Sequence, residues 1–174
     1  MMTSGLKAAK ELTKNIWQPD KFCYLIRMKT ILLYVLLVSQ SIAALGAQSG
    51  LTKEQKVVAI TILAEARGEG DTGMGAVAAV IAQRAIDRKQ TWEKVCLAKW
   101  QFSCWNGKKV SDLDHLLNVP QAKMAIYLAK NMHRIDRAKI GNANHYYADY
   151  IKAPYWAKGE KPVAKIGRHI FYKL

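Results

Sequence analysis

Carboxylate side chains are scarce in this chain of 174 residues: 13 Asp and Glu stand against 27 Lys and Arg, which gives a net charge of +14. The sequence has no CxxC pair, no HExxH and no other Cys/His spacing typical of a metal site, so we expect neither a metal nor a cofactor. It also lacks internal repeats, low-complexity segments and recognised nucleic-acid-binding motifs. We therefore expect one small domain that is a monomer. Because the chain is basic, its partner is expected to be anionic.

The first 47 residues have the composition of an export leader. A basic segment precedes the uncharged and mostly apolar run over residues 30–47 (TILLYVLLVSQSIAALGA), which ends in small residues. The run is near the length of about 17–25 residues that spans a bilayer, although Ser39, Gln40 and Ser41 weaken it as a permanent span. We therefore predict an N-terminal extension over residues 1–47 with a cleaved signal peptide or an uncleaved anchor. The functional domain would cover residues 48–174 and be exported to the periplasm or the cell exterior.

The positive charge is not confined to the leader. Six basic and two acidic residues lie in the first 47 residues, so the rest of the chain keeps 21 basic and 11 acidic residues, a net charge of +10. Nucleic acid, anionic lipid and a wall polymer such as peptidoglycan are all possible partners of such a surface. Export argues against nucleic acid.

Hydrophobic spacing and capping residues predict a mainly α fold with a small irregular or β-containing element. The sequence from Thr52 to Gln55 fits a capping box and predicts a helix through about Arg67. Further helices are predicted over residues 74–87, 92–98 and 119–132, with a turn over 70–73 and a loop over 101–109. The aromatic segment from Gly141 onwards predicts short strands or loops.

Glu65 is the residue whose position most suggests chemistry. It shares a helix face with Val58 and Ile62 and lies in the last turn, where the helix dipole is negative. A desolvated position at that end favours the uncharged carboxylic acid. Such an acid can protonate the leaving oxygen in glycosidic cleavage. The alternative is that Glu65 only forms an ion pair with an arginine such as Arg84, which is expected to be a structural ion-pair residue.

Several blocks of residues resemble one family, the SleB-type cell-wall hydrolases that include the spore cortex-lytic enzymes. The first block runs from 65–69 (EARGE) through Gly73 and residues 76–80 to Arg84. The others are 101–105 (QFSCW), 145–148 (HYYA), 154–157 (PYWA) and 166–172 (IGRHIFY). The resemblance covers about residues 52–174, with the blocks in the family's order.

The resemblance implies a lysozyme-like helical fold and cleavage of peptidoglycan between N-acetylmuramic acid and N-acetylglucosamine. It implies a lytic transglycosylase with Glu65 as the catalytic acid. Glu69 is the second choice for that role; otherwise we expect Glu69 and Arg84 in supporting positions, where Glu69 could orient substrate or pair with an arginine. No separate wall-binding domain precedes the matching blocks, which favours wall remodelling or phage-mediated host lysis over spore germination. The alternatives are lysozyme-type hydrolysis of the same bond and a non-catalytic, membrane-anchored wall-binding protein.

Side chains in the loop-like segments are candidates to bind sugar rings or sugar hydroxyls. They are Gln101, Phe102, Trp105, Tyr146 and Tyr147. Packing in the core is the alternative, and we favour it for Phe102 and Trp156. His145 and His169 are expected to have structural or hydrogen-bonding roles.

Cys96 and Cys104 are eight residues apart, across a predicted bend from helix to loop. An exported protein can join such a pair in a disulfide. Two buried thiols are the alternative.

Overall fold

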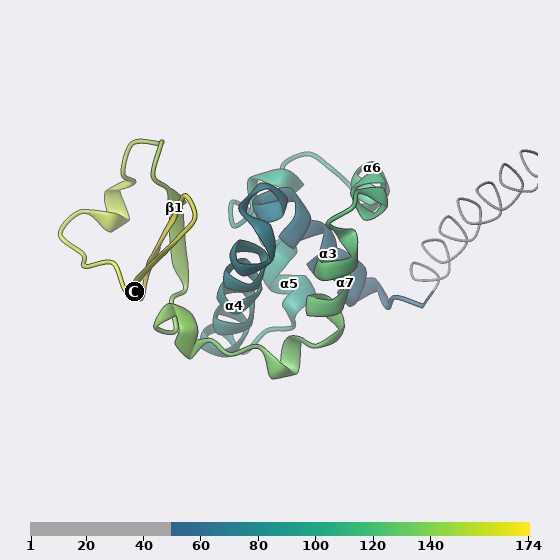
Figure 1. The fold of residues 1–174 in the computed structure, drawn as a ribbon, viewed down its shortest axis with the longest axis horizontal. Helices are drawn as coiled ribbons and strands as arrows, with labels where there is room; N and C mark the ends of the chain where they lie inside the picture. Colours follow the sequence, from purple (N-terminus) through teal and green to yellow (C-terminus); the bar gives the residue numbers. More distant parts are fainter. Residues whose placement is uncertain (1–49) are drawn as a thin grey trace, which may run out of the picture. The chain divides into compact units, whose positions relative to one another are not determined.

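The computed structural model describes residues 50–174 of the chain (Figure 1). The predicted leader over residues 1–47 lies outside the described residues. Helices predominate in the described part, and three short strands form one sheet, so the predicted mainly α fold with a small β element is confirmed. Within residues 50–174 no helix combines the length and the apolar character needed to cross a bilayer.

Helix α3 (Lys53–Ala66) begins at the predicted capping box. The Thr52 hydroxyl accepts a hydrogen bond from the Gln55 amide at 3.2 Å, and the Gln55 side chain accepts one from the Thr52 amide at 3.0 Å. Most of the helix is buried, including Ile60, Ile62 and Leu63. Full burial of such a side chain contributes about 1.5–3 kcal/mol. These contacts hold α3 in the interior of the helical part, where it packs against α4, α5 and α7.

Helix α4 (Gly70–Arg88) follows α3 after a single 3-10 turn over Arg67–Glu69. It begins at Gly70 rather than at Met74, so the predicted turn over residues 70–73 is wrong. The 3-10 turn already completes the change of direction, and Gly70 adopts a φ of 69° that favours glycine. The early start of α4 places Glu69 directly between the two helices.

The remaining helices are short. Thr91 caps α5 (Trp92–Leu97) as predicted, and its hydroxyl accepts from the Lys94 amide at 3.3 Å. Helix α6 is Val110–Leu113, and α7 is Ala122–Lys130, which is shorter at both ends than predicted. Further 3-10 helices are Ser103–Trp105, Asp114–Asn118, Met132–Arg134, Ala138–Ile140 and Tyr155–Ala157.

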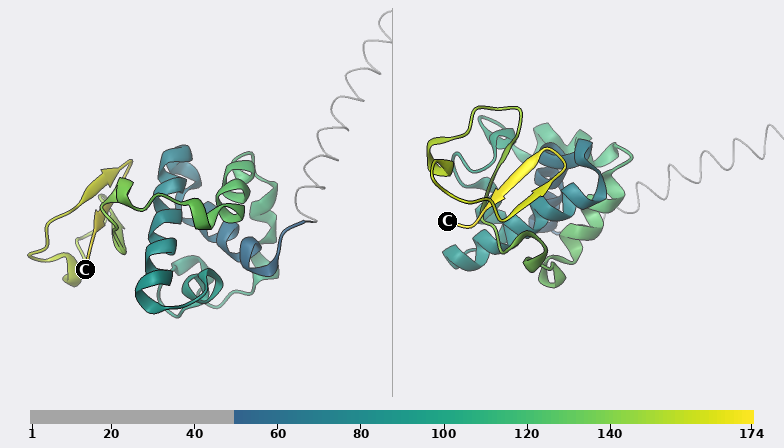
Figure 2. Two further views of the ribbon diagram at one scale, coloured as in Figure 1. Left: turned by 90° about the horizontal axis from the view of Figure 1, so that it is seen from below. Right: turned by 60° about the vertical axis from the view of Figure 1, so that its left-hand side comes forward.

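The sheet consists of β1 (His145–Ala148), β2 (Ala164–Ile166) and β3 (His169–Tyr172), all antiparallel, in the order β1-β3-β2. Tyr146 lies opposite Phe171 in this register. Figures 1 and 2 show α4 lying between the sheet and the other helices. Phe171 packs in a second, smaller core with alanines and a valine of α4, so α4 is the support on which the sheet rests.

Candidate active site

Glu65 lies in the last turn of α3 and is half-buried. The Tyr146 hydroxyl donates a hydrogen bond to its Oε2 atom at 2.8 Å, from a position 81 residues further along the chain. Within residues 50–174 Glu65 makes no ion pair. Its partner is therefore a tyrosine of the sheet, not the arginine that the alternative interpretation supposed.

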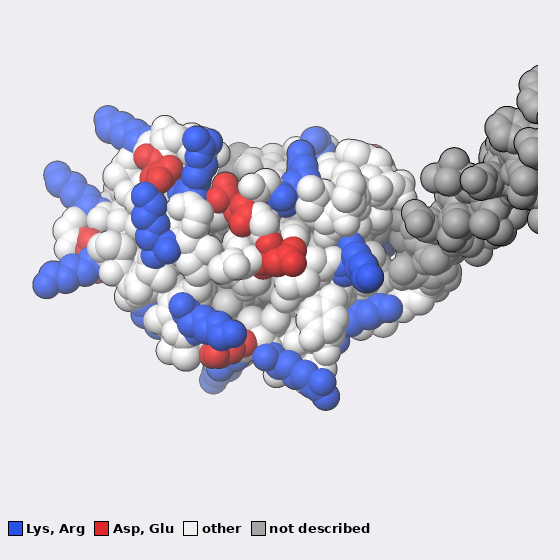
Figure 3. Space-filling model, in the orientation of Figure 1, with Lys and Arg blue, Asp and Glu red and all other residues white. Residues whose placement is uncertain are grey.

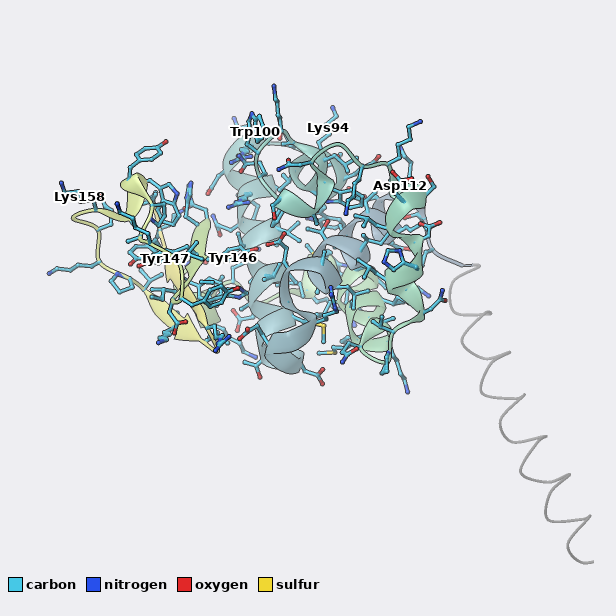
Figure 4. The ribbon with its side chains drawn as sticks, turned by 90° about the horizontal axis from the view of Figure 1, so that it is seen from above. Lys94, Trp100, Asp112, Tyr146, Tyr147 and Lys158 are labelled. Carbon is cyan, nitrogen blue, oxygen red and sulfur yellow. The ribbon has the colours of Figure 1, made fainter. Side chains whose placement is uncertain are left out.

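Tyr146 reaches Glu65 because alternate residues of β1 point to opposite faces of the sheet. Its ring lies 4.9 Å from the ring of His169 and 5.6 Å from that of Phe171, both on β3. Burial raises the pKa of the Tyr146 hydroxyl well above its ordinary value, and the nearby Glu65 carboxylate raises it further. The hydroxyl therefore keeps its proton at neutral pH and stays a hydrogen-bond donor to Glu65. Figure 4 shows Tyr146 between the sheet and the helices.

Cys104 is a neighbour of Glu65 that the sequence did not indicate. Burial raises the pKa of the Cys104 thiol to about 12, and the adjacent Glu65 carboxylate contributes to the rise. Cys96 is buried on α5, and burial likewise raises the pKa of its thiol to about 12. Both cysteines are free, so the structure has the thiol alternative and not the disulfide. At neutral pH a protonated thiol therefore borders the catalytic candidate.

Arg84 is buried on α4 but forms none of the ion pairs found within residues 50–174, so the expected ion-pair role is wrong. Its Nε atom donates to the main-chain oxygen of Asn144 at 2.7 Å, because the chain before β1 presents a carbonyl there. Its guanidinium carbon lies 5.1 Å from the centre of the Phe102 ring, and its Nη1 atom is buried without a hydrogen-bond partner. Burial lowers the pKa of Arg84. This buried positive charge is close enough to interact electrostatically with both Glu65 and Tyr146.

Glu69 is held by the turn between β2 and β3. Its Oε2 atom accepts a hydrogen bond from the Arg168 amide at 2.8 Å. Gly73 and Gly167 both leave room for its side chain, since a Cβ atom at either position would collide with Glu69. Gly167 also has a φ of 55°, which favours glycine. Through its bond to the Arg168 amide, Glu69 links the turn between β2 and β3 to the start of α4.

His169 is buried beside this group, and its Nδ1 atom has no hydrogen-bond partner. Burial lowers the pKa of His169, while Glu69, Glu65 and Asp149 act in the opposite direction. The ring is therefore mostly uncharged at neutral pH and supports Tyr146 from β3. In the sequence His169 had no spacing that linked it to Glu65, because strand pairing alone brings it there.

Two of the predicted substrate-binding residues belong to the core instead. Phe102 is 2% exposed and Trp105 is 8% exposed, so neither presents a ring face to a sugar. The Trp105 indole nitrogen donates to the buried Thr61 hydroxyl at 3.0 Å. A small helical domain needs these large side chains to fill its interior, and the core alternative is the correct one for both.

The other predicted sugar-binding residues lie at different places. Gln101 is half-buried, and its side-chain oxygen accepts from Arg88 at 2.7 Å. Tyr147 lies on the face of β1 opposite to Tyr146, with its ring 5.9 Å from those of Trp156 and Tyr172. Of the predicted set, Tyr146 is the residue that hydrogen-bonds to Glu65.

A shallow depression of about 340 Å³ occurs elsewhere on the surface, lined by Glu54, Ala85, Ile86, Gln90, Thr91 and Trp92. Glu54 is in the first turn of α3, whereas Glu65 is in the last, about 16 Å away along the helix. The depression is therefore separate from the site. Within residues 50–174 no three His, Cys, Asp or Glu side chains are grouped so that they could hold a metal ion.

The sequence profile of a family described as Cell Wall Hydrolase matches residues 68–172. The chain belongs to this family. The match covers α4, the sheet and the segments between them. It begins three residues after Glu65, so Glu65 lies just outside the matched range of this cell-wall hydrolase.

Two solved structures are similar to this cell-wall hydrolase. One is the catalytic domain of the Bacillus cereus SleB protein, with a TM-score of 0.56 and 25% sequence identity over 71% of this chain and 93% of that one. The other is the catalytic domain of the germination-specific lytic transglycosylase SleB from Bacillus anthracis. Its TM-score is 0.55, at 25% identity over 71% of this chain and 98% of that one. No curated protein matches the chain.

Proposed function

We propose that this cell-wall hydrolase is a peptidoglycan lytic transglycosylase with Glu65 as its catalytic acid and base. The bond between the Tyr146 hydroxyl and Glu65 Oε2 is the observation that carries the proposal. Glu65 is half-buried at the end of a helix, and the Tyr146 hydroxyl is a hydrogen-bond donor that can stabilise its ionised form. The similarity to a lytic transglycosylase from Bacillus anthracis supports the same reaction.

The reaction requires one carboxyl group to act twice. Protonated Glu65 gives its proton to the oxygen that links muramic acid C1 to the next sugar, and the C1–O bond breaks. The Tyr146 hydroxyl then stabilises the Glu65 carboxylate while C1 is oxocarbenium-like. The 6-hydroxyl of the same muramic acid attacks C1, and its proton passes to Glu65. The 1,6-anhydro product leaves Glu65 protonated for the next cycle.

Lysozyme-type hydrolysis of the same bond is the main alternative. It would need a second carboxylate to act as nucleophile or to activate water. Glu69 is the nearest candidate in the sequence, but one of its oxygens is already bound to the Arg168 amide. This engagement favours a structural role for Glu69 and a single-carboxylate reaction.

The test is the mass of the products released from purified sacculi by the wild type and by Glu65→Gln. We expect 1,6-anhydro muropeptides from the wild type and no cleavage by the variant, which keeps the shape of the side chain. Hydrated reducing ends would mean a lysozyme. Cleavage that survives Glu65→Gln but not Glu69→Gln would transfer the catalytic role to Glu69.

A non-catalytic wall-binding protein is the alternative from another class, and its support is the net positive charge. It would bind sacculi without releasing any product. A peptidoglycan substrate also agrees with the predicted export, because the wall lies outside the cytoplasm. Remodelling of the cell's own wall and phage-mediated host lysis both fit this activity.

A further inference from the structure

The loop between β1 and β2, residues 149–163, carries several exposed large side chains within one short segment. We call it the basic loop. Tyr155 is 92% exposed and Tyr150 is 69% exposed, and Ile151 is exposed between them. Exposed aromatic and aliphatic side chains gathered in one segment are typical of a binding surface.

The basic loop carries three lysines against two carboxylates, Asp149 and the exposed Glu160, and none of the three lysines forms an ion pair within the described part of the chain. The lysines are Lys152, Lys158 and Lys161, and all three are exposed. The Asp149 carboxylate is already paired with Lys165 at 2.8 Å. Figure 3 shows basic side chains projecting from this side of the molecule, and Figure 4 shows Lys158 pointing away from the helices. The three lysines are therefore available to an anionic partner.

The loop is anchored at both ends and from beneath. The Asp149 amide donates to the Arg168 carbonyl at 2.7 Å, and the Val163 amide donates to the Phe171 carbonyl at 2.8 Å. The Trp156 ring lies 5.1 Å from the ring of His145 on the outer face of the sheet. These contacts fix the two ends of the loop and Trp156, so less backbone has to be ordered when a partner binds, which lowers the entropy cost of binding.

The loop continues directly from the strand that holds Tyr146 against Glu65, since Ala148 ends β1 and Asp149 begins the loop. A glycan strand bound at Glu65 would have to continue past β1 for its neighbouring units to meet the loop. In peptidoglycan those units carry stem peptides with free carboxylates. The charge of the loop is complementary to these carboxylates, and its tyrosines can pack on the sugars and peptide backbones.

We propose that the basic loop binds the stem-peptide carboxylates of peptidoglycan next to the bond that Glu65 cleaves. The proposal rests on the proposed function, because that function supplies the polymer. It assigns to residues 149–163 a preference for strands that carry peptides over bare glycan.

The experiment measures binding of the full chain to sacculi by co-sedimentation, in a Glu65→Gln background so that the polymer stays intact. One variant combines Lys152→Gln, Lys158→Gln and Lys161→Gln. Its control combines Lys123→Gln and Lys130→Gln on α7 with Arg134→Gln, which removes the same charge from exposed positions on another part of the surface. A second pair compares Tyr155→Ser with Tyr127→Ser, since Tyr127 is 60% exposed on α7.

We expect the loop variant to bind about tenfold more weakly than the control, in line with the loss of three exposed ion pairs of ordinary strength. The difference should shrink at high salt, which screens such pairs. Sacculi whose carboxylates have been converted to amides should bind the parent protein as weakly as native sacculi bind the loop variant. Tyr155→Ser should weaken binding more than Tyr127→Ser.

Equal binding by the loop variant and its control, or unchanged binding to amidated sacculi, would overturn the proposal. The proposal would also be overturned if the loop variant bound sacculi like its control but bound vesicles of phosphatidylglycerol more weakly than its control. The loop would then bind a membrane. None of these results bears on the products that the wild type releases. Failure of the loop proposal is therefore distinguishable from failure of the transglycosylase proposal.

Discussion

Removal of one hydroxyl group, in Tyr146→Phe, tests whether the bond to Glu65 contributes to the reaction. The phenyl ring keeps its packing on His169 and Phe171, so the sheet should stay in place. The lost bond is 2.8 Å long and is made to the carboxyl group of Glu65. Hydrogen bonds to charged groups contribute about 1.5–3 kcal/mol.

This energy is available mainly after Glu65 has given up its proton, because the hydroxyl then donates to a full negative charge. A loss realised in the transition state reduces the rate tenfold for about each 1.4 kcal/mol. We therefore expect kcat on soluble glycan fragments to fall by about ten- to a hundredfold. KM should change little, since the hydroxyl is already engaged by Glu65 before substrate binds.

The matched control is Tyr147→Phe, which removes a hydroxyl from the opposite face of the same strand. Tyr147 stacks on Tyr172, away from Glu65, so its loss should leave kcat within about twofold of the wild type, in keeping with surface changes outside the site. Thermal unfolding of both variants shows whether the fold is kept. A Tyr146→Phe protein with normal stability and unchanged kcat would refute the role we give to this bond.

Two further predictions concern the residues around Glu69 and His169. Gly167→Ala places a Cβ atom against the Glu69 carboxylate, at a position where the backbone φ is 55°. The backbone strain costs about 1–2 kcal/mol, and the bond from the Arg168 amide to Glu69 is weakened. Together these effects should lower the free energy of urea unfolding by about 3 kcal/mol. The double variant with Glu69→Ala should lose less than the sum of the single losses, and strict additivity would contradict the contact. His169 has a pKa lowered by burial, so below about pH 6.5 the unfolded chain binds more protons than the folded one, and the free energy of unfolding should fall as the pH decreases. Between pH 7 and pH 5 the free energy of unfolding should change less with pH in His169→Gln than in His133→Gln, a substitution at an exposed histidine. The same pH dependence in both variants would contradict this role of His169.

Local sequence features were sufficient to predict the helix that carries Glu65. The capping box at Thr52 and the spacing of apolar residues determined where α3 begins and ends, and so placed Glu65 in a last turn. These features depend on residues within four positions of each other, which is the range over which a helix forms its own hydrogen bonds. The turn over residues 70–73 was predicted wrongly because the 3-10 turn before it already reversed the chain.

The partners of Glu65 were decided by the tertiary structure alone. Tyr146 lies 81 residues from Glu65 in the sequence. Which face of the sheet its side chain occupies depends on the register of β1 with β3. Likewise, burial of Trp105 and the carbonyl partner of Arg84 follow from how separate segments pack. The sequence by itself determined a helix that ends in a carboxylate, a basic surface and a family resemblance. Long-range packing decided which side chains surround that carboxylate, because no local pattern encodes contacts between elements that meet only after folding.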